Sequence, residues 1–126
     1  MSCRLAIKRV YLPSDPSDGL RVLVDRLWPR GLSRERAAAD EWRKDLAPSP
    51  ALRSWFGHQP ERFGAFAAAY RQELDGNPSA LDFARRCREL PETQTVTLLY
   101  GARDPECNHA VVLHQWLTDA STRTDK

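Results

Sequence analysis

Three stretches of the chain carry the apolar pattern of β-strands. Leu5–Leu12 alternates loosely between apolar and polar residues, whereas Val22–Val24 and Thr95–Tyr100 contain short continuous apolar runs. Runs rich in leucine and valine and bounded by turn residues are typical of buried strands. The loop Pro13–Gly19 is shorter than the usual parallel crossover of about a dozen residues. The first strand therefore either pairs antiparallel with the second or lies elsewhere in the sheet.

Helical periodicity fills most of the remaining chain. Apolar residues recur at steps of three and four in five segments, which predict helices from Ser33 through Asp45, from Pro50 to Phe56, from Pro60 to Asp75, from Pro78 to Leu90 and from Pro105 to about Asp119. The clearest stripe comprises Phe63, Phe66, Ala67, Tyr70 and Leu74. We expect Phe63, Phe66, Tyr70, Phe83 and Leu98 to share one core, and the helical pattern also places Cys87 inside it.

These elements predict an α/β fold, a single domain with a small, mostly parallel sheet flanked by helices. The helices between the second and third strands are long enough for a parallel crossover. Parallel strands end at the same edge of a sheet, where open α/β sheets place their ligands. The segments Asp25–Gly31 and Tyr100–His109, which follow these strands, should therefore face one crevice.

Composition narrows the class of protein. With 41% apolar and 29% charged residues, the chain is that of one globular domain over 1–126, with a polar, frayed tail at about 120–126. It has no apolar run of about eighteen residues and no secretory signal, so we expect a cytoplasmic protein without membrane contact. The three cysteines lack metal-type spacing, which indicates reduced thiols.

Charge is distributed unevenly along the chain. The net charge of +2 is too small to indicate nucleic-acid binding by itself. Residues 1–60 contain 11 basic and 7 acidic residues, and the remainder contains 8 and 10. The basic first half fits either an anionic ligand or a solvated basic face.

The first segment after a strand carries one carboxylate, two guanidiniums and an indole. Asp25 is a candidate catalytic base, or else a clamp that orients Arg26 or Arg30 through a bidentate pair. We expect Arg26 and Arg30 to bind an anion, unless they form a structural salt bridge with Asp25. Trp28 either covers the edge of the core or offers a stacking surface to a ring. Pro29 and Gly31 end the strand here.

The second segment reads YGARDPECNHA. Asp104 is predicted to cap the last helix, which would place Cys107, Asn108 and His109 in its anion-favouring first turn. His109 shares a stripe with apolar residues and is either a buried structural histidine or a general acid/base. Cys107 is either an ordinary cysteine or a nucleophile. Tyr100, Asp104 and Asn108 are further candidate ligand-binding residues, whereas His58 and His114 are expected at the surface.

Familiar catalytic motifs are absent from the sequence. There is no phosphate-binding Walker loop, dinucleotide fingerprint, paired-cysteine zinc site, Gly-x-Ser-x-Gly elbow or zinc-protease histidine pair. We therefore expect no metal site, and the sequence specifies neither a cofactor nor an oligomeric state.

The chain resembles the YeaO-like proteins, a small bacterial family of unknown function. The resemblance rests on the segments GLRVLVDRLWPRGL, EWRKDLAPSPALRSWF, FAAAYRQEL and TLLYGARDPECNHAVVL. It implies a bacterial cytosolic α/β protein with recurring positions at Asp25, Arg26, Arg30, Trp42, Pro48, Ser49, Arg53, Tyr70, Glu73, Asp104, Asn108 and His109. The chain also looks like a broader group with a Cys-His-Arg triplet, but here that triplet reads Asn108-His109-Ala110.

Two functions fit these observations. The first is an enzyme, or an enzyme-like binder, that holds a nucleotide or phosphorylated metabolite between Arg26, Arg30 and the helix start, with Asp25 and His109 handling protons. The alternative is a non-catalytic nucleic-acid or protein-interaction module that uses the basic half of the chain. Nucleic acid is the less favoured partner, because no helix with base-reading residues is evident.

Overall fold

Four parallel strands form one sheet in the order β1-β4-β2-β3. The computed structural model describes residues 3–123, with side chains as far as residue 119. The strands are β1 (Arg4–Arg9), β2 (Leu20–Leu23), β3 (Glu41–Trp42) and β4 (Thr95–Tyr100). Strands β2 and β4 pair in parallel, as predicted, so the α/β fold with a parallel sheet is confirmed. The first strand is also parallel and lies on the far side of β4, where Ile7 pairs with Leu98.

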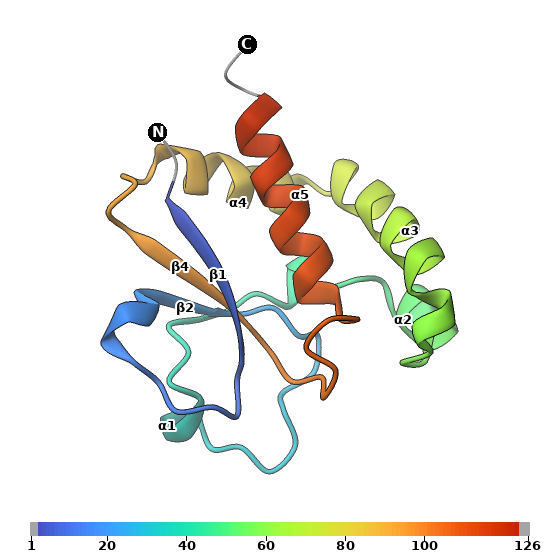
Figure 1. Cartoon of the computed structure of the whole chain (residues 1–126), viewed down its shortest axis with the longest axis horizontal. Helices are drawn as coiled ribbons and strands as arrows, with labels where there is room; N and C mark the ends of the chain where they lie inside the picture. Colours follow the sequence, from blue (N-terminus) through green and yellow to red (C-terminus); the bar gives the residue numbers. More distant parts are fainter. Residues whose placement is uncertain (1–2, 124–126) are drawn as a thin grey trace.

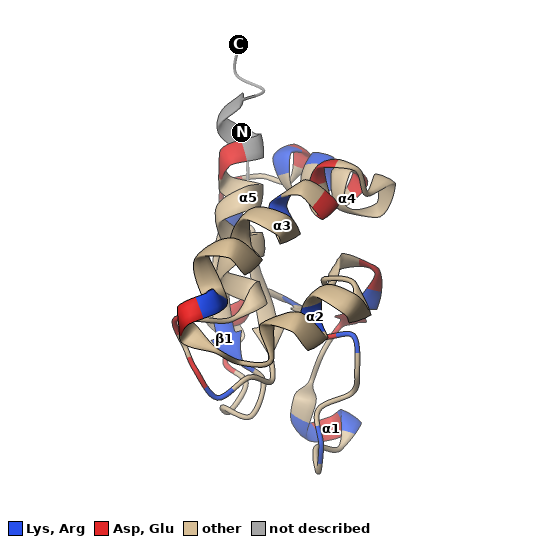
Figure 2. Ribbon diagram, turned by 90° about the vertical axis from the view of Figure 1, so that its right-hand side faces the viewer, with Lys and Arg blue, Asp and Glu red and all other residues tan. Residues whose placement is uncertain are grey.

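The helices leave one side of the molecule more thickly covered than the other. They are α1 (Arg34–Ala37), α2 (Pro50–Phe56), α3 (Phe63–Asp75), α4 (Pro78–Glu89) and α5 (His109–Arg123), with short 3-10 turns η1 (Pro16–Asp18), η2 (Lys44–Leu46) and η3 (Pro60–Arg62). Helices α3, α4 and α5 lie close together, whereas α1 lies apart from them (Figures 1 and 2). No helix in the described part of the chain is both long and apolar enough to span a membrane.

The two central strands are buried on both faces, which explains their continuous apolar sequences. On the face covered by helices, Val22, Val96 and Leu98 join one large core with the aromatic stripe of α3. Phe66, Tyr70, Phe83 and Leu98 are buried there as predicted, and Phe63 packs against them while half-buried. Cys87 is likewise buried in this core. The opposite face holds a smaller apolar cluster that contains Val10, Leu23, Leu32, Ala37 and Leu99.

The predicted helix from Ser33 through Asp45 is wrong beyond its first turn. Ser33 does cap a helix, but Ala38 adopts a left-handed conformation with φ of 47° and ends it. Glu41 and Trp42 then pair with Val22 and Leu23 as the edge strand β3. The four-residue spacing of apolar residues was misleading. A single helical turn leaves most of its backbone N–H and C=O groups without hydrogen-bond partners, whereas pairing with the free edge of β2 supplies such partners.

The last helix also differs from its predicted bounds. It begins at His109 and not at Pro105, and its backbone is helical as far as Arg123. The frayed tail at about 120–126 stays a prediction, and residues 124–126 lie outside the described chain. Asp104 instead closes the preceding turn, since its Oδ1 accepts hydrogen bonds from the backbone N–H groups of Glu106 and Cys107.

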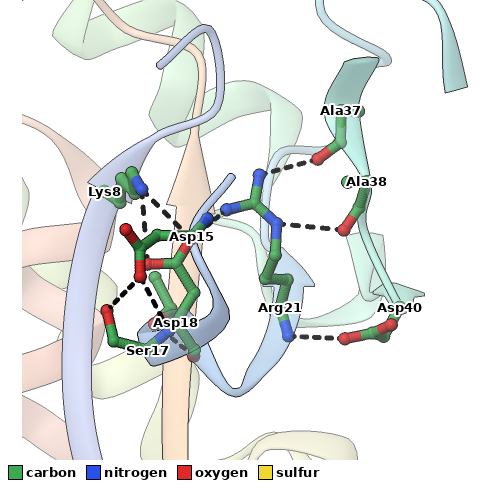
Figure 3. A network of polar contacts seen from close by, with 9 residues as sticks. Lys8, Asp15, Ser17, Asp18, Arg21, Ala37, Ala38 and Asp40 are labelled. Carbon is green, nitrogen blue, oxygen red and sulfur yellow. Dashed lines mark hydrogen bonds and ion pairs between the residues drawn. The ribbon is translucent and has the colours of Figure 1, made fainter. Parts of the chain in front are cut away.

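A buried polar network secures the start of β2 (Figure 3). The Asp18 carboxylate accepts hydrogen bonds from Lys8 Nζ at 3.1 Å and from Arg21 Nη1 at 2.5 Å. The same guanidinium donates to the carbonyls of Ala37 and Ala38 at 2.8 and 2.9 Å. Arg21 thereby fixes the segment that leads into β3, so these charges hold the fold together.

Candidate functional site

The segments that follow β2 and β4 meet at one edge of the sheet, as the parallel pairing predicts. A cavity of about 320 Å³ opens there, and we refer to it as the edge pocket. Its lining comprises Tyr11, Asp25, Arg26, Leu27, Trp28, Pro29, Arg30, Ala47, Pro48, Arg53, Phe56, His58, Phe66, Gly101, Ala102, Asn108 and His109. Six of the eight predicted site residues are among them: Asp25, Arg26, Trp28, Arg30, Asn108 and His109.

Asp25 links the ends of the two central strands. Its Oδ2 accepts a hydrogen bond from the backbone N–H of Gly101 at 2.9 Å, just after β4. A Cβ at position 101 would lie only 2.8 Å from that oxygen, so glycine permits the close approach. Asp25 Oδ1 lies 3.2 Å from His109 Nε2. The carboxylate therefore contacts His109 and Gly101, and the predicted pairing with Arg26 or Arg30 is wrong.

His109 Nε2 lies close to a main-chain carbonyl as well as to this carboxylate. Its Nε2 lies 3.0 Å from the oxygen of Val24. A carbonyl oxygen can only accept, so Nε2 carries the proton in the neutral ring and Nδ1 is left as an acceptor. With the N–H directed at Val24, Asp25 Oδ1 is buried without a hydrogen bond among the described residues. The half-buried His109 thus serves the packing of α5 on β2 and also lines the edge pocket.

The three arginines of the edge pocket differ in whether their guanidiniums have partners within the protein. Arg26 donates to the carbonyl of Pro48 from Nε and Nη2, at 3.3 and 3.2 Å, which ties the segment before α2 to the end of β2. Arg30 and Arg53 are exposed, and neither guanidinium has an ion-pair partner among the residues described. These two guanidiniums are the cations available to an anion in the edge pocket.

Two tryptophans and a tyrosine support the segment after β2. Trp42 donates from Nε1 to the Asp25 carbonyl at 2.8 Å and meets Trp28 edge to face, with ring centroids 5.3 Å apart. Trp28 donates to the Leu32 carbonyl and packs on the smaller core, so it covers the core edge and also lines the edge pocket. Tyr11 donates its hydroxyl hydrogen to the Arg30 carbonyl at 2.8 Å.

A second set of hydrogen bonds holds the wall formed by Ala47 and Pro48. Glu73 of α3 accepts from the backbone N–H and the hydroxyl of Ser49, at 2.8 and 2.6 Å. Tyr70 donates to the carbonyl of Leu46. Burial, with a smaller contribution from the negative charge of Glu73, raises the pKa of Tyr70, so its hydroxyl remains a donor. Helix α3 thus fixes this wall of the edge pocket.

Two predicted ligand-binding residues lie outside the edge pocket lining. Tyr100 is buried in the main core, because alternation along β4 turns it toward the helices. Asp104 closes the turn before α5, as described above, and its carbonyl accepts a hydrogen bond from Asn108 Nδ2 at 2.8 Å. Asn108 caps α5, since its Oδ1 accepts from the Val111 N–H at 3.0 Å. It lines the edge pocket, but its amide is engaged by the fold.

Cys107 does not have the environment of an activated thiol. It precedes α5 and so lies outside the helix. Burial and the nearby negative charges of Asp104 and Glu106 raise the pKa of its thiol. Since nucleophilic cysteines require a lowered pKa, this environment favours the interpretation of Cys107 as an ordinary cysteine.

Sequence reasoning from the residues alone missed much of the edge pocket. No sequence signal indicates Tyr11 and Phe56 as site residues, and Pro48 and Arg53 are implied only by the family resemblance, yet all four line the edge pocket. His58 is exposed as predicted and also lines the edge pocket, whereas His114 is half-buried, with Nε2 3.0 Å from the Leu5 carbonyl. The available signal was the Ser49-Pro50 helix start, because it predicts the short helix α2 that carries Arg53 and Phe56.

No group of three or more His, Cys, Asp or Glu side chains with metal-binding geometry occurs in the described part of the chain. The groups of the edge pocket that can contact a ligand are guanidiniums, imidazoles and apolar side chains. This combination suits an organic anion.

Comparison with known proteins identifies relatives but no activity. The model of a family described as the inactive DUF488-N3 subclade matches residues 4–126. The uncharacterized protein YeaO of Escherichia coli K12 is 42% identical over 110 residues, which cover 87% of this chain and 93% of YeaO. The uncharacterized protein Rv3073c of Mycobacterium tuberculosis H37Rv is 42% identical over 114 residues, covering 90% and 93%. No solved structure matches the chain significantly.

Proposed function

Because the chain belongs to the inactive DUF488-N3 subclade, and so to the YeaO-like proteins predicted from its sequence, we propose that its edge pocket binds a small organic anion without converting it. The observation that carries this proposal is the pair of exposed guanidiniums, Arg30 and Arg53, which face one cavity without ion-pair partners among the described residues. Structural arginines of this chain, such as Arg21 and Arg86, are paired with carboxylates. Arg30 and Arg53 lack such a carboxylate and line one cavity, and the two features together support a ligand as their partner.

Binding without turnover fits the state of the residues that would perform chemistry. Asp25 and His109 face each other, but Asp25 is bonded to Gly101 and His109 Nε2 to the Val24 carbonyl. The group with a Cys-His-Arg triplet is matched here only at the histidine, with Asn108 and Ala110 on either side. Asn108 caps a helix and Ala110 is fully buried. Neither residue supplies a nucleophile or a cation to the edge pocket.

A nucleic-acid-binding role has less support. The net charge is +2, and Figure 2 shows basic and acidic positions interspersed over the helices. Affinity for nucleic acid comes largely from neutralising many phosphates along an extended surface. Two available guanidiniums in one cavity suit a single anionic group better.

The proposal is tested by thermal unfolding with inorganic phosphate, sulfate, phenyl phosphate and succinate as probes. At a concentration of about 100 times its dissociation constant, a probe should stabilise the protein by about 2.7 kcal/mol. Arg30→Ala should change the stability of the free protein by less than about 0.5 kcal/mol, as is usual for exposed residues, and should abolish the stabilisation by the probe.

Arg4→Ala is the matched control, since Arg4 is exposed at the start of β1, at the opposite edge of the sheet. It should leave the response to each probe unchanged. The proposal is wrong if no probe stabilises the wild-type protein, or if Arg30→Ala and Arg53→Ala both respond as the wild type does.

A further inference from the structure

The geometry points to a more specific ligand for the edge pocket: a phosphate monoester that carries one flat apolar group. This inference rests on the proposed function, because it names the class of anion that the same cavity selects. It is drawn from three features of the lining: its formal charge, the hydrogen bonds that its charged side chains already make within the protein, and its apolar side chains.

The lining carries a formal charge of +2. Its charged residues are the guanidiniums of Arg26, Arg30 and Arg53 and the carboxylate of Asp25, with the imidazoles of His58 and His109 counted as neutral. A ligand with two negative charges neutralises this excess, whereas a monocarboxylate or a phosphate diester supplies only one. A phosphate monoester has a second pKa near 6 and carries close to two negative charges above pH 7.

The hydrogen bonds that these charged side chains make within the protein also favour a ligand with two negative charges. Arg26 donates to the carbonyls of Ala47 and Pro48, and Asp25 Oδ2 accepts a hydrogen bond from the backbone N–H of Gly101. Asp25 Oδ1 is buried, so an incoming anion does not contact this oxygen directly. The groups left are Arg30, which follows β2, and Arg53 on α2, and both line the cavity. Each guanidinium can bind two oxygens side by side, and a terminal phosphate offers three.

Apolar side chains form a large part of the remaining lining, and the volume of the cavity limits the size of the ligand. Phe56 and Phe66 stack with their ring centroids 4.4 Å apart, and both line the edge pocket together with Pro29, Ala47 and Pro48. A cavity of about 320 Å³ is at the small end of the range for ligand sites. It suits one phosphate with one ring system, and these walls would contact the ring.

The test compares two probes that have the same ring and differ by one charge. Phenyl phosphate is the monoester and methyl phenyl phosphate is the diester, and both are titrated calorimetrically about two pH units above the second phosphate pKa of about 6. We expect the wild-type protein to bind the monoester at least about tenfold more tightly, the value of one lost charged hydrogen bond. Inorganic phosphate, which lacks the ring, should bind more weakly than phenyl phosphate.

The variants Arg30→Gln and Arg53→Gln should each reduce the preference for the monoester, whereas Arg4→Gln should preserve it. Equal affinities for the two esters, or tighter binding of benzoate than of phenyl phosphate, would overturn this inference while leaving an anion site in place. Failure of every anion to bind would overturn the proposed function itself.

Discussion

Replacement of Asp18 by asparagine tests the buried network at the start of β2. The side chains of Asp18 and Arg21 are only 10% and 5% exposed, and Lys8 also contacts the carboxylate. Asparagine has the same size but no charge, so Asp18→Asn leaves the Arg21 guanidinium buried without a counter-ion. Removing one partner of a buried ion pair costs about 3–5 kcal/mol. Because Arg21 keeps its two carbonyl acceptors, we expect the lower end, about 3 kcal/mol.

The assay is urea unfolding at neutral pH, followed by circular dichroism. Asp82→Asn is the matched control, because Asp82 pairs with Arg85 at the surface, with side chains 60% and 62% exposed. Exposed pairs contribute about 0–1 kcal/mol, so this control should lose little stability. A loss below about 1 kcal/mol for Asp18→Asn, or losses of equal size in both variants, would refute the argument from burial.

The pH dependence of the same variant gives an independent check. Burial by itself raises the pKa of Asp18, but hydrogen bonds from Lys8, the backbone N–H of Asp15 and Arg21 outweigh burial, and the pKa lies below its ordinary value. A carboxyl group with a lowered folded-state pKa stabilises the protein above its unfolded pKa of about 3.9, and the stabilisation disappears as the pH falls through the folded pKa. The difference in unfolding free energy between the wild type and Asp18→Asn should therefore begin to shrink near pH 4 and should vanish below the folded-state pKa of Asp18. A constant difference down to the acid transition would contradict this linkage.

Three further predictions concern the core and the edge pocket. Phe66→Ala should cost about 3–5 kcal/mol in urea unfolding, because Phe66 is 1% exposed and stacks on Phe56, and a loss below about 1 kcal/mol would contradict its place in the core. Tyr11→Phe removes the hydroxyl that contacts the Arg30 carbonyl and should weaken phenyl phosphate binding by up to about tenfold, but it should cause no further loss in an Arg30→Ala background. Alkylation of Cys107 by iodoacetamide, located by mass spectrometry, should be slower at neutral pH than that of free cysteine and should accelerate as the pH rises, because the pKa of its thiol is raised; a rate above that of free cysteine would be inconsistent with this environment.

The sequence by itself determined the central strands, the helices α2 to α4 and the edge at which the site lies. These features depend on local signals: continuous apolar runs, capping residues such as Ser49 and Asn77, and prolines at helix starts. The connection between β2 and β4 is long enough for a parallel crossover, and this arrangement brings Asp25 and His109 to one edge, where Asp25 Oδ1 lies 3.2 Å from His109 Nε2.

Only the tertiary structure decided which groups complete the site. Trp42 lies in strand β3 and not on a helix, because the free edge of β2 offers backbone partners that no local periodicity encodes. Tyr11 joins the edge pocket because the sheet order places β1 next to β4, from where its hydroxyl reaches the Arg30 carbonyl. The alternative in which Asp25 pairs with Arg26 or Arg30 fails for the same reason, because its neighbours in space are Gly101 and His109. Such contacts depend on pairing between distant segments, and this pairing is fixed only when the whole sheet forms.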